Sequence, residues 1–262
     1  MYITQFKEEI VERFDQLKSN LQNIINEFSG KVGIIVKVDG EEIFSKNESK
    51  VFQSASLIKL FILEALLEKI SQGELSYSDK KSVDSMDKVP GFGVLKVLDD
   101  NLSVTIKDLA TLMITLSDNT ATNMLIDILG IDYIQSFIEK KSYYETQLQR
   151  KMYDSEARER GLDNFTSARD TLKVLENLYC DETALFILKN QLCNSKIPLY
   201  FFRKVEIAHK TGDLTNIEHD AGRIFFKNSF VDLIILAEGE NKEAVLLNNR
   251  LGECIYENFK NC

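Results

Sequence analysis

The chain opens with a helical pattern followed by two strands. Apolar residues recur every three or four positions over the first segment, and a stripe of this kind predicts a long amphipathic helix that ends at Gly30. Residues 32–38 (VGIIVKV) and the EEIFS segment are separated by Asp39-Gly40, a dipeptide typical of a tight hairpin turn. The apolar stripe consists of Phe6, Ile10, Phe14, Leu17, Leu21, Ile24 and Phe28.

The middle of the chain is predominantly helical in pattern. Residues 57–70 (LIKLFILEALLEKI) are apolar on nearly all sides, which is typical of a helix buried inside the protein, and Lys59 is the exception among them. A polar stretch covers residues 71–93. Further helices are predicted at residues 106–116, at residues 121–129 with Gly130 closing the helix, from a capping Ser167 with Asp170 to Tyr179, and from Asp181 to Lys189.

Strand-forming sequence returns late, in segments that begin at Phe201, Gly222 and Phe230, and residues 241–259 restore a helical period. This order predicts an α/β plus all-α fold, in which an antiparallel sheet is flanked by the N- and C-terminal helices and a helical subdomain is inserted. We expect residues 1–53 and 197–262 to form the α/β sheet subdomain and residues 54–196 the helical subdomain, with an active site in the cleft between them.

Composition narrows the function classes. The chain has 262 residues, enough for a sizeable core, and its net charge of -9 opposes broad attachment to nucleic acid or to anionic lipid. No apolar run reaches the length of a membrane span. We therefore expect a monomer that acts on a small molecule or a peptide. As written, the sequence shows no signal peptide, which indicates a cytoplasmic protein, or a secreted one if a signal was removed.

Metal and cofactor chemistry are not expected. The four cysteines, Cys180, Cys193, Cys254 and Cys262, contain no CxxC pair and are predicted to be free thiols. Only two histidines occur: His209 is predicted to be packed in a strand, and His219 is placed in a polar turn, where either a packed or a catalytic role is open. Zinc would lack its usual ligands.

Ser56 and Lys59 form an S-x-x-K at the start of the buried helix, where a spacing of three puts both side chains on one helical face. Burial disfavours the charged form of lysine and leaves an amine that can accept a proton from a serine nucleophile. The same S-x-x-K spacing occurs at Ser78 with Lys81 and at Ser85 with Lys88, but both of these pairs lie in predicted polar loops. As an alternative, Lys59 could extend its amine to the surface.

Two further motifs occur in contexts that suit a site. Ser117-Asp118-Asn119 lies between two predicted helices, although such residues also cap helices. Lys210-Thr211-Gly212 follows the late strand that starts at Phe201, and its glycine allows close approach of a ligand or backbone. A strand that ends in a turn would account for the second motif equally well.

Together and in this order, S-x-x-K, S-D-N and K-T-G resemble the signature of class A β-lactamases and penicillin-binding proteins. The resemblance extends over essentially the whole chain. It implies a catalytic Ser56 as the acylated nucleophile, Lys59 as its proton acceptor, and Ser117 as the residue that passes a proton to the leaving nitrogen. Asn119 would orient Lys59 and the substrate amide. Substrate binding would also involve Lys210 and Thr211, which would hold a carboxylate, Gly212, and Asp213, whose backbone N–H would form the oxyanion hole with that of Ser56.

The chain departs from this pattern at two places. A carboxylate at Asp213 would repel an anionic substrate if it pointed into the cleft. When Arg150 is aligned with the arginine of the deacylation loop, Met152 stands where class A enzymes have the glutamate that activates water. Asp154 and Glu156 are the nearest carboxylates, and either a replacement role or simple exposure is open for both.

Three functions remain. The first is a serine hydrolase that opens a β-lactam or related amide through an acyl-Ser56 intermediate, an activity associated with antibiotic resistance. The second is a penicillin-binding or sensor-like protein with a long-lived acyl-enzyme. The third is a serine amidase or glutaminase-like enzyme on the same fold.

Overall fold

The computed structural model describes the backbone of residues 2–261 and the side chains of residues 12–261. Its centre is an antiparallel sheet in the order β2-β1-β9-β8-β7, so the N-terminal hairpin lies beside the last strand of the chain. The sheet is thus completed by strands from both ends of the sequence, as predicted. Its strands are β1 (Lys31–Val38), β2 (Glu41–Lys46), β7 (Glu206–Leu214), β8 (Ile217–Phe225) and β9 (Phe230–Glu238).

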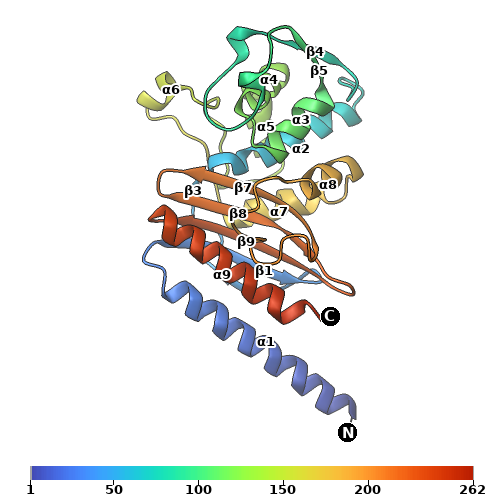
Figure 1. Ribbon diagram of the computed structural model, residues 1–262, viewed down its shortest axis with the longest axis vertical. Coiled ribbons are helices and arrows are strands. Elements are labelled where there is room, and N and C mark those ends of the chain that lie inside the picture. Colours follow the sequence, from blue (N-terminus) through green and yellow to red (C-terminus); the bar gives the residue numbers. More distant parts are fainter. Residues whose placement is uncertain (1, 262) are drawn as a thin grey trace.

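Both faces of the sheet are covered. Helices α1 (Tyr2–Asn26) and α9 (Asn241–Phe259) pack on the outer face, and the helical region lies beyond the inner face (Figure 1). Ile34 belongs to the outer core with Leu21, whereas its neighbour Ile35 belongs to the inner core with Phe61. Because successive side chains point to opposite faces and both faces are buried, the central residues Ile34, Ile35 and Val36 of β1 are all apolar.

Helix α2 (Ile58–Ser71) occupies the centre of the helical region, and every residue from Ile58 to Leu66 is buried. The antiparallel sheet with flanking helices and an inserted helical part confirms the predicted fold class. The remaining elements are β3 (Phe52–Gln53), β4 (Lys80–Val83), β5 (Leu102–Thr105), α3 (Ile106–Thr115), α4 (Asn119–Leu129), α5 (Ile131–Lys140), α6 (Ser155–Glu159), β6 (Phe165–Thr166), α7 (Ala168–Leu178) and α8 (Glu182–Lys189), with short 3-10 helices at Ala55–Leu57, Ser85–Asp87 and Leu95–Val97.

Several predicted boundaries were wrong. Helix α1 ends at Asn26 rather than Gly30, and of its predicted stripe Leu17 and Leu21 are buried while the side chains of Phe6 and Ile10 lie outside the described residues. The pairing of β4 with β5 was missed because β4 is polar and largely exposed, so it carries no apolar alternation.

The strand expected from Phe201 begins only at Glu206. Backbone hydrogen bonds from Phe201 to Pro198 and from Lys204 to Phe201 form turns, and Arg203 has a left-handed φ of 66°. Strand β7 also ends later than predicted, at Leu214. Lys210-Thr211-Gly212 therefore lies within this strand and does not follow it.

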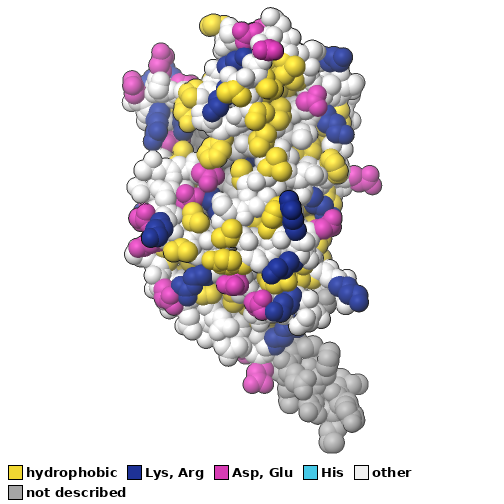
Figure 2. All heavy atoms as spheres, in the orientation of Figure 1, with side chains coloured by type: hydrophobic (Ala, Val, Ile, Leu, Met, Phe, Trp, Pro, Cys, Tyr) yellow, Lys and Arg dark blue, Asp and Glu magenta, His cyan; other side chains and the backbone are white. Residues whose placement is uncertain are grey.

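Charged residues of both signs lie on the face of the molecule that Figure 2 draws. Basic and acidic side chains are interspersed there, which agrees with a modest net charge of -9. Among the described helices, none is long and apolar enough to cross a membrane.

The outer core provides a test of the packing. Leu21 is fully buried between α1 and the sheet, and we expect Leu21→Ala to lower the free energy of unfolding by about 2–5 kcal/mol through lost burial and the cavity left behind. Leu246→Ala is the matched control, because Leu246 is 45% exposed and should cost about 0.5 kcal/mol or less. Urea denaturation measures both values, and equal losses would contradict the described packing.

Candidate active site

Ser56 lies in the 3-10 helix that leads into α2, at the wall of a cleft of about 380 Å³. The residue before it, Ala55, has a left-handed φ of 46°, an uncommon conformation for a residue with a Cβ. Such strained backbone is concentrated at functional sites. The turn holds the half-buried Ser56 at the cleft, and the buried helix α2 begins two residues later at Ile58.

Lys59 is buried completely, three residues after Ser56. Its Nζ donates to the carbonyl oxygen of Ser117 at 2.7 Å, to Ser117 Oγ at 3.0 Å and to Asn119 Oδ1 at 2.9 Å. Burial lowers the pKa of Lys59 well below its ordinary value, the charge of Lys210 lowers it further, and Asp118 acts in the opposite direction. Lys59 is fully buried, so the alternative of a lysine that extends its amine to the surface is wrong, and burial favours the neutral form of the amine.

The Ser117-Asp118-Asn119 segment both caps helix α4 and contacts the buried amine of Lys59. Ser117 has a left-handed φ of 53° and is 2% exposed, which turns its hydroxyl toward Lys59. Asp118 caps α4 by accepting from the backbone of Ala121, and its other oxygen accepts from Val94 and Leu95. Helix capping and a site position thus occur in the same three residues.

Strand β7 approaches the turn that carries Ser56 closely at Gly212. A Cβ on Gly212 would lie 3.2 Å from Ala55 Cβ and 3.3 Å from the backbone nitrogen of Ser56, so a larger residue would crowd the turn. Lys210, on the same strand, is fully buried and donates to the carbonyl of Thr211 at 2.9 Å. Burial lowers the pKa of Lys210 to about 8. The hydroxyl of Thr211 is buried without a hydrogen-bond partner in the described chain.

Asp213 lines the cleft with Ser56, Asn119 and Met152. Its carboxylate pairs with Lys196 Nζ at 2.8 Å. Burial raises the pKa of Asp213, but the charge and hydrogen bond of Lys196 outweigh burial and hold the pKa below its ordinary range. The counter-charge to Asp213 in the structure is therefore Lys196, a residue that the sequence analysis did not select.

Met152 faces the same cleft and is 9% exposed. Its backbone is held from both sides by Asn123, which accepts from the Met152 N–H at 2.8 Å and donates to its carbonyl at 3.0 Å. The loop is closed by an ion pair between Arg150 and Asp163 at 2.7 Å. Asn123 and Asp163 were also missed, because an amide and a carboxylate at these spacings form no recognised motif.

Asp154 and Glu156, the two carboxylates that could replace the missing glutamate, differ in their position relative to the cleft. Asp154 lines the cleft, but its Oδ1 caps α6 by accepting from Ala157 at 2.9 Å. Glu156 is exposed and is not among the residues that line the cleft. Neither arrangement presents a carboxylate that is held toward Ser56.

Both histidines are fully buried. His209 contacts Asp220 at 2.8 Å, as a packed strand residue should. The placement of His219 in a polar turn was wrong: it lies in β8, accepts from Ala237 N at Nδ1 and donates from Nε2 to the carbonyl of Gln53. Within the described residues no group of His, Cys, Asp and Glu could hold a metal ion. Cys180, Cys193 and Cys254 are free thiols, and Cys262 lies outside the described residues.

The pH dependence of stability tests the neutral state of His219. Burial lowers its pKa to about 4 from 6.5, although the hydrogen bond to Gln53 acts in the opposite direction. Between pH 6.5 and pH 4 the unfolded chain therefore binds a proton at His219, whereas the folded protein keeps His219 neutral. As a result, the free energy of unfolding falls as the pH drops through this window, by an amount on the order of 3 kcal/mol. His219→Gln should flatten the curve of unfolding free energy over that window. An unchanged slope would contradict the assignment.

Comparison with known proteins yields consistent matches. The family described as the beta-lactamase enzyme family matches residues 16–259. Beta-lactamase BRO-1 of Moraxella catarrhalis is 23% identical over 89% of this chain and 80% of its own. A beta-lactamase structure from Sphaerobacter thermophilus is 25% identical with a TM-score of 0.81, covering 92% of this chain and 95% of its own. A mutant of PBP-A, determined as an acyl-enzyme complex with penicillin G, is 23% identical with a TM-score of 0.76 and covers 94% and 96%.

Proposed function

Because the chain belongs to the beta-lactamase enzyme family and is a serine β-lactamase-like hydrolase, we propose that it opens the amide of a β-lactam, or of a related substrate, by acyl transfer to Ser56. We further propose that the acyl-enzyme is long-lived. The observation that carries the proposal is the completely buried Lys59, which hydrogen-bonds Ser117 and Asn119 three residues after a serine at the cleft.

Acylation would proceed with a defined path for each proton. Ser56 Oγ attacks the amide carbonyl and gives up its proton to the neutral amine of Lys59. The backbone N–H groups of Ser56 and Asp213 donate to the developing oxyanion, and a lost donor of this kind typically costs about 2.7–4 kcal/mol. Ser117, hydrogen-bonded to Lys59 at 3.0 Å, gives its hydroxyl proton to the departing nitrogen as the C–N bond breaks, and Lys59 returns to Ser117 the proton that it took from Ser56. Lys210 and Thr211 bind the polar flank of the substrate.

Hydrolysis of the acyl-enzyme requires a base that activates water. The thioether of Met152 cannot accept a proton, and its backbone is fixed by Asn123 so that another group cannot easily take its place. Asp154 is committed to the cap of α6. These contacts support slow turnover, close to the behaviour of a penicillin-binding protein. The PBP-A acyl-enzyme complex with penicillin G supports the same chemistry on this fold.

Intact-mass spectrometry after incubation with benzylpenicillin tests the acylation step. We expect the mass of one opened penicillin to be added to the native protein and no addition to Ser56→Ala, because the nucleophile is absent. Hydrolysed product in solution should stay well below one equivalent over the period in which the adduct persists, because the opened penicillin remains attached to Ser56. An adduct on Ser56→Ala, or neither adduct nor product on the native protein, would overturn the proposal and favour an amidase or glutaminase-like substrate.

Replacement of Met152 tests the deacylation step. Met152→Glu places a carboxylate at the cleft wall, and we expect the acyl-enzyme to decay at least about a hundredfold faster, the lower range for general base catalysis. The decay is followed by loss of the adduct mass. Met152→Gln is the control, because it matches the size and polarity of glutamate without the base. Equal acceleration by both variants, or none by the glutamate, would contradict the role assigned to this position.

A further inference from the structure

A second pocket, which we call the side pocket, adjoins the cleft and has a volume of about 270 Å³. Met152, Tyr153 and Asp154 line both the cleft and the side pocket, so these three residues form the partition between the two spaces. The side pocket is also lined by the thioethers of Met86 and Met124, which adapt to the shape of an apolar group. The partition therefore separates the cleft from space that an apolar substituent could occupy.

Two of the three partition residues are held by the rest of the chain. The backbone of Met152 is hydrogen-bonded on both sides to Asn123, and Asp154 caps α6. The side chain of Tyr153 is 56% exposed and, within the described residues, makes no hydrogen bond and no ring contact. Tyr153 is also the largest side chain of the three, so its removal would open the partition most.

The ring of Tyr153 reaches from its own loop to the loop that carries Gly91. A Cβ on Gly91 would collide with the Tyr153 hydroxyl and would lie 2.5 Å from the ring atom Cε2 and 2.7 Å from Asn119 Nδ2. Gly91 thus leaves the room that the end of the ring occupies beside Asn119. Tyr153 itself has a left-handed φ of 59°, a conformation that is uncommon for a bulky residue and that is concentrated at functional sites.

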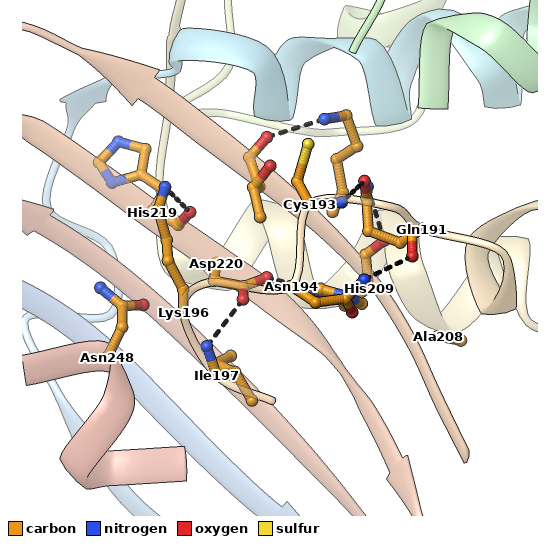
Figure 3. Close-up of polar contacts among 12 residues, drawn as sticks. Gln191, Cys193, Asn194, Lys196, Ile197, Ala208, His209, His219, Asp220 and Asn248 are labelled. Carbon is orange, nitrogen blue, oxygen red and sulfur yellow. Dashed lines mark hydrogen bonds and ion pairs between the residues drawn. The ribbon is translucent and has the colours of Figure 1, made fainter. Parts of the chain in front are cut away.

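The opposite wall of the cleft, at the end of β7, is fixed by the elements around it. Asp213 is paired with Lys196 at 2.8 Å, and Lys196 also donates to the carbonyl oxygen of His219 at 3.0 Å. The next residue, Ile197, donates from its backbone to Asp220 at 3.0 Å. Figure 3 shows Lys196 reaching the backbone of His219 and Ile197 bonded to Asp220. Additional room for a substrate must therefore come from the side of Tyr153.

The proposed function decides which part of the substrate meets the partition. Lys210 and Thr211 bind the carboxylate, whereas Leu214, further along the same strand, lines the cleft. In a penicillin, the carboxylate and the acylamino substituent lie on opposite sides of the β-lactam ring. With the lactam carbonyl at Ser56, the acyl group therefore extends into the cleft, toward the partition.

We propose that Tyr153 limits the size of the acyl group that the cleft accepts. An acyl group that is unbranched at its first carbon fits beside the ring, whereas a group that carries two rings on this carbon meets Tyr153 and needs the space of the side pocket. This inference rests on the proposed function, since it requires acyl transfer to Ser56. It makes Tyr153 a specificity-determining residue.

The test compares benzylpenicillin with the penicillin that carries a diphenylacetyl group, which has one further phenyl ring on the first carbon of the acyl group. Both compounds have the same carboxylate and an uncharged acyl group, so Arg150, Arg158 and Asp213 of the cleft wall bear equally on both. The rate of adduct formation is followed by intact-mass spectrometry. We expect the native protein to react at least about fivefold more slowly with the diphenylacetyl compound, the lower limit for overpacking a closed site.

Tyr153→Asn and Tyr153→Gly remove the ring, and both new residues tolerate the left-handed backbone. Each should raise the rate of the diphenylacetyl compound relative to that of benzylpenicillin by at least about fivefold. Tyr153→Phe keeps the ring and should leave this ratio within about twofold of the native value. Tyr144→Asn is the matched control, because Tyr144 is 83% exposed and lines neither the cleft nor the side pocket, and it should leave both rates unchanged.

Equal rates for the two compounds on the native protein would overturn the inference while leaving acylation of Ser56 intact. The same conclusion would follow if the ratio stayed at its native value in both variants that lack the ring. A variant that folds poorly would slow both compounds together, and the comparison on the native protein would then decide alone. No adduct with either compound on the native protein would overturn the proposed function and the inference with it.

Discussion

The burial of one lysine amine governs the arrangement of the site. Lys59 lies on a helix whose neighbouring residues are all buried, where a charged or unpartnered amine is costly. Its three hydrogen bonds to Ser117 and Asn119 satisfy the amine and at the same time attach α2 to the loop before α4. The left-handed backbone of Ser117 follows from this requirement, because it presents both the carbonyl and the hydroxyl to Lys59.

The second constraint is the close contact between the edge strand β7 and the turn that carries Ser56. Gly212 leaves room for the backbone of Ser56 and for Ala55, so two segments far apart in the sequence meet without a side chain between them. The same strand carries Lys210, whose burial lowers its pKa to about 8, and Asp213, whose carboxylate reaches the cleft. The inner and outer cores on the two faces of the sheet hold this edge in place.

Ion pairs and an apolar side chain at the border of the cleft bear on the two proposed steps, acylation and deacylation. Arg150 is engaged by Asp163 and Lys196 by Asp213, so the loop and the strand that border the cleft are each fixed by a paired charge. Met152 lies between them with no group that could activate water. On the proposed function, the cleft is therefore better equipped for acylation of Ser56 than for hydrolysis of the resulting ester.

Hydrophobic periodicity and three short motifs predicted the N-terminal helix and hairpin, the buried α2 and the candidate residues Ser56, Lys59 and Lys210, because these features are local in sequence. The sequence could not determine partners contributed by distant segments. The pairing of Asp213 with Lys196 and the burial of His219 depend on how β7, β8 and α9 pack, and neither carries a local signal. Ion pairs and burial are properties of the assembled sheet, so only the tertiary structure decided them.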